Sequence, residues 1–264
     1  MRLKDKVILI TASTRGIGLA TVKACARESA IVYMAARNPE RAKMEADKLN
    51  SEGWRVKYVF NDATQPDSYA SMVDEVVRNE GRIDVLVNNF GTSNRQKDLD
   101  FANTDASVFL DTVTINLRSV FLASQAAVRH MQKTGGGSII NISSVGGLVP
   151  DVSQVAYGTS KAAINYLTKQ IAVHEAKNNI RCNAVLPGMT ATDAVEKNLT
   201  EEFRSLFLRH IPLKRMGMPE EIAAAVVYFA SNEAAYTTGQ IMAVSGGFGL
   251  ATPVYSDFFD KVEF

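Results

Sequence analysis

Short apolar runs alternate with longer amphipathic stretches along almost the whole chain, and this alternation constrains the fold more than any other feature. The apolar runs are nearly continuous, as strands covered on both faces by helices need to be. The pattern predicts strands at residues 7–11, 30–35, 56–60, 85–88, 138–143, 180–186 and 241–244. It predicts helices between them, at residues 16–28, 39–52, 66–80, 106–133, 155–178 and 219–230.

Strands that are separated by helices form a parallel sheet with right-handed crossovers. We therefore predict an α/β fold, a Rossmann-like doubly wound seven-stranded parallel sheet with helices on both faces. No linker or internal repeat divides the chain, so residues 1–264 are expected to form a single domain. Residues 190–212 interrupt the alternation at the end where such sheets bind ligands, and we expect them to be a substrate lid. Residues 249–264 form an aromatic C-terminal tail that is expected to close a pocket.

The composition excludes several classes of function. The chain has 29 Lys and Arg against 28 Asp and Glu, which gives no electrostatic footprint for nucleic acid and little repulsion against self-association. The first ten residues are too charged for a signal peptide or a membrane span, so we expect a cytoplasmic protein without membrane contact. Cys25 and Cys182 are expected to be reduced thiols, and the scattered histidines predict no metal site.

A glycine-rich turn joins the first predicted strand to the first predicted helix. Residues 11–18 read T-A-S-T-R-G-I-G. Backbone amides and the positive end of a helix at such a turn can bind a pyrophosphate. Gly16 and Gly18 have no side chain, so a ligand can approach the backbone closely. The turn therefore predicts a nucleotide site.

This turn resembles the cofactor loop of the short-chain dehydrogenase/reductase family, T-G-x-x-x-G-x-G, with Ala12 in place of the first glycine. The methyl group of Ala12 is compatible with the loop if its φ stays negative. Further motifs of the family follow in order: N-D-A-T at 61–64, N-N-F-G at 88–91, P-G at 187–188 and S-G-G at 245–247. The resemblance covers essentially the whole chain. It implies that a nicotinamide cofactor is bound by Thr11, Ser13, Thr14, Arg15, Gly16, Ile17, Gly18, Arg37, Asp62, Ala63, Asn89, Gly91, Tyr157, Lys161, Pro187, Gly188 and Thr190.

The end of the second strand indicates which nicotinamide cofactor is used. An acidic residue there would bind the ribose hydroxyls of NAD, but this chain has Ala36 followed by Arg37. Arg15 and Arg37 resemble the positions where NADP-using members of the family hold the 2′-phosphate. Two charge-assisted contacts contribute about 3–6 kcal/mol, a preference of roughly a hundredfold to ten-thousandfold. We therefore predict NADP.

Tyr157 and Lys161 stand four residues apart at the start of a predicted helix, so their side chains share one face. A phenol with a free pKa of about 10 is a poor base near neutral pH. The ammonium of Lys161 and the positive nicotinamide ring are expected to lower the pKa of Tyr157. The hydroxyl is then able to exchange a proton with an alcohol or a ketone.

The resemblance extends this pair to four catalytic residues. Ser144, in N-I-S-S, resembles the serine that holds the substrate oxygen, while Ser143 is expected to point the opposite way. Asn116 resembles the residue that supports a water linked to the lysine. The implied roles are general base or acid for Tyr157, ribose binding and pKa control for Lys161, orientation of the alcohol for Ser144 and proton relay for Asn116.

The segments that follow the fourth, fifth and sixth strands are apolar, which suits a bulky hydrophobic alcohol such as a steroid. The expected substrate contacts are Ser144, Phe90, Leu148 and Met189. Several stretches, among them V-N-N-F-G and G-G-F-G-L-A-T-P, resemble the bacterial NADP-dependent bile-acid hydroxysteroid dehydrogenases of the same family, especially those that act on the 7α-hydroxyl. The resemblance also implies a homotetramer, with the two longest helices as candidate interfaces.

Three alternatives stay open. Related enzymes act at position 12α or position 3 of the steroid. A 3-oxoacyl-carrier-protein reductase would reduce acetoacetyl thioesters instead of sterol ketones. A catalytically silent NADP-binding regulator would bind the cofactor without turnover.

Overall fold

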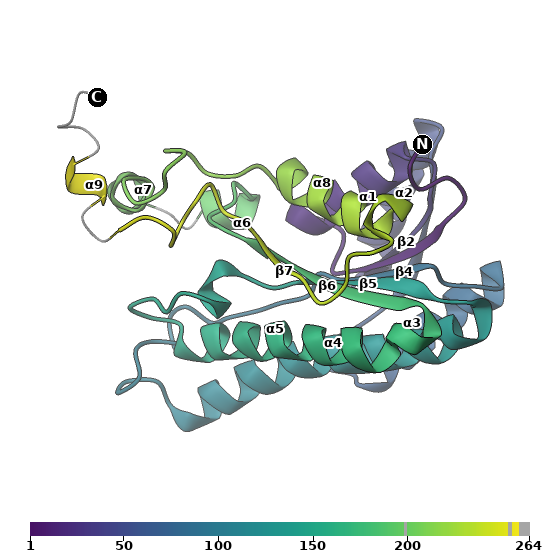
Figure 1. Cartoon of the computed structure of the whole chain (residues 1–264), viewed down its shortest axis with the longest axis horizontal. Coiled ribbons are helices and arrows are strands. Elements are labelled where there is room, and N and C mark those ends of the chain that lie inside the picture. Colours follow the sequence, from purple (N-terminus) through teal and green to yellow (C-terminus); the bar gives the residue numbers. More distant parts are fainter. Residues whose placement is uncertain (198–199, 253–254, 259–264) are drawn as a thin grey trace.

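The computed structural model describes residues 1–197, 200–252 and 255–258 (Figure 1). Seven strands form one parallel sheet in the order β3-β2-β1-β4-β5-β6-β7. Their bounds are β1 Val7–Thr11, β2 Ile31–Ala36, β3 Arg55–Phe60, β4 Val85–Asn88, β5 Gly137–Ile142, β6 Ile180–Pro187 and β7 Ile241–Val244. The strand order reverses between β1 and β4, and this reversal opens a crevice at their carboxyl ends.

Helices cover both faces of the sheet (Figure 1). One face carries α1 (Gly16–Arg27), α2 (Pro39–Ser51) and α8 (Pro219–Ala230). The other face carries α3 (Asp67–Glu80), α4 (Ala106–Thr134) and α5 (Val155–Glu175). The short elements are η1 (Val145–Gly147), η2 (Ala176–Asn178), α6 (Asp193–Glu196), α7 (Glu201–Leu208), η3 (Asn232–Ala234) and α9 (Tyr255–Phe258).

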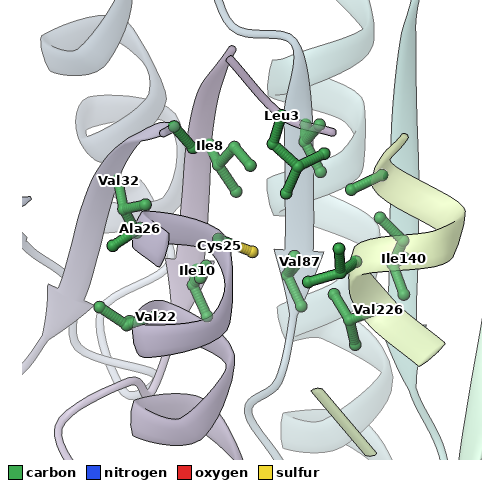
Figure 2. Close-up of a cluster of buried hydrophobic side chains, with 14 of the residues drawn as sticks. Leu3, Ile8, Ile10, Val22, Cys25, Ala26, Val32, Val87, Ile140 and Val226 are labelled. Carbon is green, nitrogen blue, oxygen red and sulfur yellow. The ribbon is translucent and has the colours of Figure 1, made fainter. Parts of the chain in front are cut away.

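Alternate residues of β1 enter two separate cores, because successive side chains of a strand point to opposite faces. Ile8 and Ile10 pack with Val22 and Cys25 of α1 and with Val226 of α8 (Figure 2). The core on the opposite face includes Val7, Leu9, Met72, Ala123 and Ala172. The central strands of the sheet are therefore buried on both sides, as the apolar runs predict.

The predicted fold is confirmed. The predicted strands and helices are present with ends that shift by one residue at most, apart from the fifth long helix, whose last turn at residues 176–178 is a 3-10 turn. One expectation is wrong: β3 is not covered on both faces. Only Val56 and Val59 are buried in this strand, while Lys57, Tyr58 and Phe60 are exposed, because β3 lies at the edge of the sheet.

Both cysteines are free and buried, as expected. Burial raises the pKa of the Cys25 thiol to about 12 and also raises the pKa of Cys182. Buried thiols with raised pKa values are chemically inert packing groups.

Helix α4 is long and apolar enough to cross a membrane by length and composition alone. In the fold, its buried residues Ala123, Ala127 and Met131 pack with Leu86 of β4 and Ile139 of β5. Its apolar character is therefore used to cover one face of the sheet.

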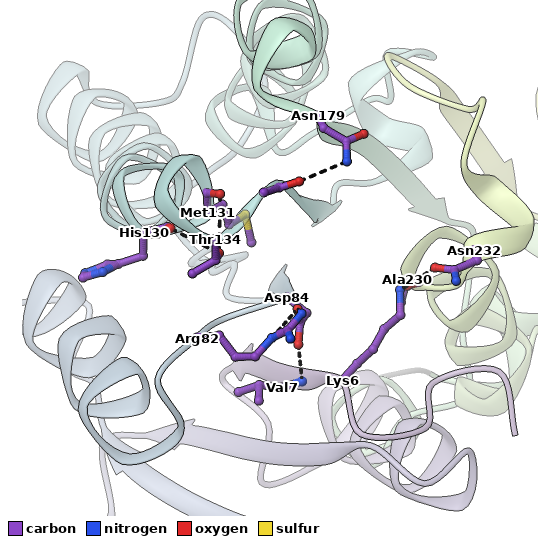
Figure 3. Close-up of polar contacts among 11 residues, drawn as sticks. Lys6, Val7, Arg82, Asp84, His130, Met131, Thr134, Asn179, Ala230 and Asn232 are labelled. Carbon is purple, nitrogen blue, oxygen red and sulfur yellow. Dashed lines mark hydrogen bonds and ion pairs between the residues drawn. The ribbon is translucent and has the colours of Figure 1, made fainter.

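Polar side chains tie the amino ends of the strands together (Figure 3). Asp84 accepts a hydrogen bond from the backbone N–H of Val7 at 2.8 Å and is paired with Arg82. Lys6 donates to the carbonyl of Ala230 at 3.1 Å and to Asn232 at 2.9 Å. These contacts lie at the opposite end of the strands from the crevice.

A buried amide network crosses the middle of the sheet. Asn88 of β4 donates to Asn141 Oδ1 of β5 at 2.8 Å and to Ser124 Oγ of α4 at 3.0 Å. Asn141 in turn donates to Thr168 Oγ1 of α5 at 2.8 Å. Buried amides are costly unless they are hydrogen-bonded. The network therefore fixes two helices to the strands whose carboxyl ends form the crevice.

We predict that Asn141→Ala lowers the free energy of unfolding by about 2–3 kcal/mol, because it removes three buried hydrogen bonds, with Asn88, Thr168 and the Cys182 sulfur, and leaves a void. Ser124→Ala removes one acceptor of Asn88 and is expected to cost about 1 kcal/mol. Chemical denaturation of both variants measures the difference. Equal stability of Asn141→Ala and the wild type would contradict a structural role for the network.

Candidate active site

A cavity of about 520 Å³ lies at the carboxyl ends of β1, β2 and β4, at the reversal of strand order. Open α/β sheets bind ligands at this position. The lining residues are Ala12, Arg15, Gly16, Ile17, Gly18, Ala35, Ala36, Arg37, Asn61, Asp62, Ala63, Thr64, Asn89, Phe90, Gly91, Thr92, Ile115, Thr192 and Asp193. The predicted nucleotide site and the cavity therefore coincide.

The glycine loop lies at one wall of this cavity. A Cβ on Gly18 would come within 2.6 Å of both the Ala12 carbonyl oxygen and Asn89 Nδ2, so a side chain has no room there. Gly16 has a φ of +52°, a conformation that glycine adopts without strain. Ala12 has a φ of +51°, so the expectation of a negative φ at this residue is wrong. Ala12 therefore adopts a left-handed backbone conformation, which costs about 1–2 kcal/mol relative to glycine at the same position.

Thr11 and Asn89 join the loop after β1 to the loop after β4. Thr11 Oγ1 accepts the backbone N–H groups of Asn89 and Phe90 at 2.9 and 3.1 Å. Asn89 Nδ2 donates to the carbonyls of Thr11 and Ala12 at 3.1 and 3.0 Å. Thr11 is buried and does not line the cavity, so it holds the two loops of the crevice together without facing a ligand.

The groups around the glycine loop fit an anionic nucleotide. Helix α1 has no side-chain cap and no acidic residue in its first turn, so its amino end is open to an anion. Ser13 is fully buried next to Ala12, and its Oγ has no hydrogen-bond partner within the described chain. A buried hydroxyl usually has a partner, and a bound ligand can supply it here.

The far end of the cavity is lined by Arg37, Asp62 and Thr64. Hydrogen bonds from the backbone amide and hydroxyl of Thr64, at 2.9 and 2.8 Å, hold the pKa of Asp62 below its usual value, and the charge of Arg37 adds to this effect. Asp62 is therefore ionised and held in place, while the exposed Arg37 has room to bind a phosphate.

The structure sorts the predicted cofactor residues into two groups. The residues that line the cavity are Arg15, Gly16, Ile17, Gly18, Arg37, Asp62, Ala63, Asn89 and Gly91. The residues that lie outside its lining are Thr11, Ser13, Thr14, Tyr157, Lys161, Pro187, Gly188 and Thr190. Sequence reasoning missed Ala35, Asn61, Thr64, Thr92, Ile115, Thr192 and Asp193. Most of these residues flank a predicted residue or motif, so their position next to a motif is the feature of the sequence that indicates them.

Ser144 and Tyr157 bring two hydroxyl groups together beyond the end of β5. Ser144 follows this strand and accepts the Gly146 N–H at 3.1 Å. Burial raises the pKa of Tyr157, and a hydrogen bond with Ser144 and the positive charge of Arg95 counteract only part of that shift. Ser143 instead donates to the Lys161 carbonyl at 3.1 Å and fastens β5 to α5. In the protein alone, the net shift of the Tyr157 pKa is upward. The predicted lowering also depends on a positive cofactor ring beside the phenol and stays a prediction.

Lys161 is buried one helical turn after Tyr157. Its Nζ donates to the carbonyl of Ile142 at 2.9 Å and lies 5.5 Å from the centre of the Tyr157 ring. Burial lowers the pKa of Lys161 to about 8. A Cβ on Gly91 would come within 2.8 Å of Lys161 Nζ. Because Gly91 lines the cavity, Nζ lies directly behind the cavity wall. The main cause of the high pKa of Tyr157 is the burial of the phenol itself.

Asn116 is fully buried in α4, and its amide makes three hydrogen bonds. Oδ1 accepts the Thr92 N–H at 2.9 Å, and Nδ2 donates to the Thr92 carbonyl at 2.9 Å and to Ser160 Oγ at 3.0 Å. The amide thus fixes the loop after β4 to α4 and α5. Its predicted role in proton relay stays a prediction.

The predicted substrate residues beside Ser144 come from three different segments of the chain. Phe90 lines the cavity, Leu148 follows η1 with 55% of its surface exposed, and Met189 is half-buried after β6. In residues 190–212, Phe207 of α7 stacks on Phe203 and on Phe248, with ring centres 6.0 and 5.0 Å apart. The predicted lid is therefore joined to the segment after β7. Phe259 and Phe264 of the tail lie outside the described residues.

No cluster of three or more His, Cys, Asp or Glu suited to a metal ion occurs within residues 1–197, 200–252 and 255–258.

The comparisons with known proteins define the class. A family model described as enoyl-(acyl carrier protein) reductase matches residues 11–249. A 7alpha-hydroxysteroid dehydrogenase of Clostridium sardiniense is 49% identical over 257 residues, which cover 97% of this chain and 98% of the relative. A 3-oxoacyl-acyl-carrier-protein reductase of Thermotoga maritima is 40% identical over 94% of this chain and 99% of its own. The chain belongs to the short-chain dehydrogenase/reductase family and is an oxidoreductase.

A solved structure agrees with this assignment. A 7alpha-hydroxysteroid dehydrogenase in complex with NADH and 7-oxo glycochenodeoxycholic acid superposes with a TM-score of 0.88 at 31% identity, covering 94% of this chain and 95% of the other. The predicted family is thus confirmed, and with it a nicotinamide cofactor for the class. The chain is similar to hydroxysteroid dehydrogenases over nearly its whole length.

We predict that Lys161→Met raises the free energy of unfolding by about 1–3 kcal/mol at pH 7. The pKa of Lys161 falls from 10.5 to about 8 on folding, so the charged form is destabilised by roughly 3 kcal/mol below pH 8. The lost hydrogen bond to Ile142 offsets about 1 kcal/mol of that gain. Between pH 8 and 10.5, Lys161 is protonated in the unfolded chain and neutral in the folded protein. The free energy of unfolding of the wild type therefore rises with pH in this range, and the advantage of Lys161→Met over the wild type shrinks.

Denaturation curves of this variant at several pH values test the expectation. Lys169→Met, at an exposed position of the same helix, serves as the control and is expected to change stability little at any pH. A variant that is less stable than the wild type at pH 7 would contradict the penalty assigned to the buried ammonium.

Proposed function

We propose that the protein is an NADP-dependent hydroxysteroid dehydrogenase that interconverts the 7α-hydroxyl of bile acids and the corresponding ketone. The observation that carries the proposal is the hydroxyl pair of Ser144 and Tyr157 beside the buried Lys161, next to a cavity that fits a nucleotide. The similarity to a 7alpha-hydroxysteroid dehydrogenase at 49% identity over 97% of the chain supports the steroid substrate.

The cofactor supplies the site that accepts or donates the hydride, because no side chain can do so. The residues that would bind it are those of the glycine loop, Asp62, Asn89 and Gly91. Arg15 and Arg37 line the same cavity, and the buried Ala36 leaves the end of β2 without an acidic group. A guanidinium pairs well with phosphate oxygens, which favours NADP over NAD.

Tyr157 moves the proton. Its hydroxyl takes the proton from the steroid hydroxyl in oxidation and returns it to the ketone oxygen in reduction. Ser144, hydrogen-bonded to Tyr157, holds the same oxygen and stabilises the charge that develops on it. The raised pKa of Tyr157 keeps the hydroxyl protonated near neutral pH, the form required for reduction.

Lys161 places a positive charge close to this pair, and its pKa of about 8 lets it exchange protons near physiological pH. A positive cofactor ring near the phenol would favour the phenolate and help oxidation. Asn116 fixes the loop after β4 beside the site, and we retain proton relay as its proposed second role.

The substrate would lie between the hydroxyl pair and an apolar wall. We assign this wall to Phe90, Leu148, Met189 and Phe207, which come from four separate segments. A wall with few polar groups suits a rigid sterol better than a sugar. The position of the oxidised hydroxyl depends on how the sterol lies along this wall, so 12α and 3 are the competing positions.

A homotetramer is part of the proposal. Helices α4 and α5 expose Leu110, Phe121, Tyr166 and Val173. Exposed apolar side chains on two adjacent helices suit a subunit interface.

The decisive experiment offers NADP⁺ with cholate, chenodeoxycholate, deoxycholate or lithocholate and follows the formation of NADPH. All four carry a 3α-hydroxyl, so the pattern identifies the position. Turnover of cholate and chenodeoxycholate alone is the expected result and means 7α. Cholate and deoxycholate alone would mean 12α, and all four would mean position 3.

Two further outcomes overturn more of the proposal. No turnover of any bile acid, with reduction of acetoacetyl thioesters, would favour a 3-oxoacyl-carrier-protein reductase, the activity named for the Thermotoga maritima relative. Cofactor binding without turnover of any alcohol would favour a silent NADP-binding regulator.

Tyr157→Phe is expected to lower kcat by about 100-fold to 10,000-fold while leaving the affinity for NADP nearly unchanged, because it removes only the proton-transfer group. Tyr166→Phe is the matched control, since Tyr166 lies exposed on the same helix. Steady-state kinetics and cofactor titration measure both variants. Near-wild-type turnover of Tyr157→Phe would exclude it as the general acid and base.

Arg37→Ala is expected to raise KM for NADP by roughly 10-fold to 100-fold and to leave KM for NAD unchanged, because one charge-assisted phosphate contact is lost. Arg41→Ala, which removes an exposed arginine four residues away, outside the cavity lining, is the control. An equal effect of Arg37→Ala on both cofactors would contradict recognition of the 2′-phosphate.

A further inference from the structure

The helix that carries Tyr157 and Lys161 is capped by a residue far away in the sequence. Gln154, at the N-cap of α5, has a φ of +63° and provides no side-chain cap. Instead, Asp98 Oδ1 accepts the Ala156 N–H at 2.9 Å, and Asp98 Oδ2 accepts the N–H of Tyr157 itself at 3.0 Å. Asp98 is fully buried.

The backbone around Asp98 completes this cap. The carbonyl of Asp98 accepts the Gln154 N–H at 3.1 Å, and the carbonyl of Leu99 accepts the Val155 N–H at 3.3 Å. Four successive amides, at residues 154–157, are therefore bound by two residues of the loop before α4. The position of the first turn of α5 is set by that loop.

The loop is itself anchored to the site. Asp98 Oδ2 accepts the Ser93 hydroxyl at 3.2 Å, and the Asp98 N–H donates to the Asn94 carbonyl at 2.7 Å. At its other end, Thr92 is held by both polar atoms of the Asn116 amide. The buried carboxylate thus has three donors, and the segment between Thr92 and Asp98 is fixed at both ends.

We propose that Asp98 is a positioning residue for the reaction: by binding the backbone amide of Tyr157, it holds the phenol hydroxyl in register with Ser144. The role rests on the proposed function of Tyr157 as acid and base. Asp98 touches neither substrate nor cofactor in this proposal and acts through α5 alone.

The physical argument is that a carboxylate at a helix amino end stabilises both the free amides and the helix dipole. Without it, two buried amides of the first turn have no acceptor, and the turn has to shift or fray to reach water. A shift of about 1 Å at a reacting group lowers a rate by roughly 100-fold. Tyr157 lies in that first turn, so its hydroxyl moves with the helix end.

The test compares Asp98→Ala, Asp98→Asn and Asp100→Asn. An asparagine retains one acceptor oxygen, so Asp98→Asn keeps one of the two amide bonds. Asp100 is a matched control in the same loop, because its carboxylate also accepts backbone amides, but those of Ala102 and Asn103 at 2.9 and 3.1 Å in an exposed turn and not those of α5. Activity is measured per mole of folded enzyme, well below the unfolding temperature.

We expect kcat to fall about 100-fold in Asp98→Ala and about 10-fold in Asp98→Asn, with KM for NADP unchanged. Asp100→Asn should stay within about twofold of the wild type. A purely structural role would lower the unfolding temperature without changing kcat of the folded enzyme, and that result would overturn the proposal. An equal loss of kcat in Asp100→Asn would also overturn it.

Amide hydrogen exchange of the peptide that spans residues 154–162 gives a readout without turnover. Faster exchange in Asp98→Asn but not in Asp100→Asn is expected, and unchanged exchange would refute the cap. This measurement decides the capping role if Asp98→Ala does not fold. If the wild type turns over none of the bile acids, or if Tyr157→Phe keeps full activity, the proposed function fails while the exchange result still stands.

Discussion

The crevice depends on the hydrogen bonds that join the loop after β1 to the loop after β4. These strands are neighbours in the sheet, but their chains turn to opposite faces, so the loops would separate without a tie. Thr11 and Asn89 supply that tie with four hydrogen bonds between 2.9 and 3.1 Å. The same contact crowds Gly18, whose missing side chain lets the first turn of α1 approach the loop. The junction therefore positions the amino end of α1 at the wall of the cavity.

Burial controls the chemistry on the other side of the crevice. Lys161 lies fully inside the protein, where its Nζ donates to the carbonyl of Ile142, and burial lowers its pKa to about 8. Tyr157 responds to burial in the opposite direction, because burial disfavours the phenolate. Burial therefore moves the two pKa values apart, with that of the lysine below that of the phenol. Near neutral pH the phenol stays protonated, while the lysine can exchange its proton.

The sequence predicts the features that depend on local pattern. Apolar periodicity fixes the strands and helices, and helical spacing places Tyr157 and Lys161 on one face. The sequence does not predict features that depend on tertiary contacts between loops. The left-handed φ of Ala12 follows from the junction with Asn89, and the raised pKa of Tyr157 follows from burial. In the sequence, Asp98 is one acidic residue in a polar loop, and only the fold shows that its carboxylate binds the first turn of α5.

The lining of the nucleotide cavity is unevenly distributed along the chain. All of its residues precede Asn116 except Thr192 and Asp193. The hydroxyl pair, the lysine and most of the apolar wall come from the later half, in Ser144, Tyr157, Lys161 and the segments after β5 and β6. Substitutions in separate regions with no shared partners usually combine additively. The hydrogen bonds of Asp98 to Tyr157 and of Asn116 to Ser160 join the two halves, so substitutions at these contacts are expected to be non-additive. Substitutions in the cavity lining and in the segments after β5 and β6 that share no such contact can be combined freely.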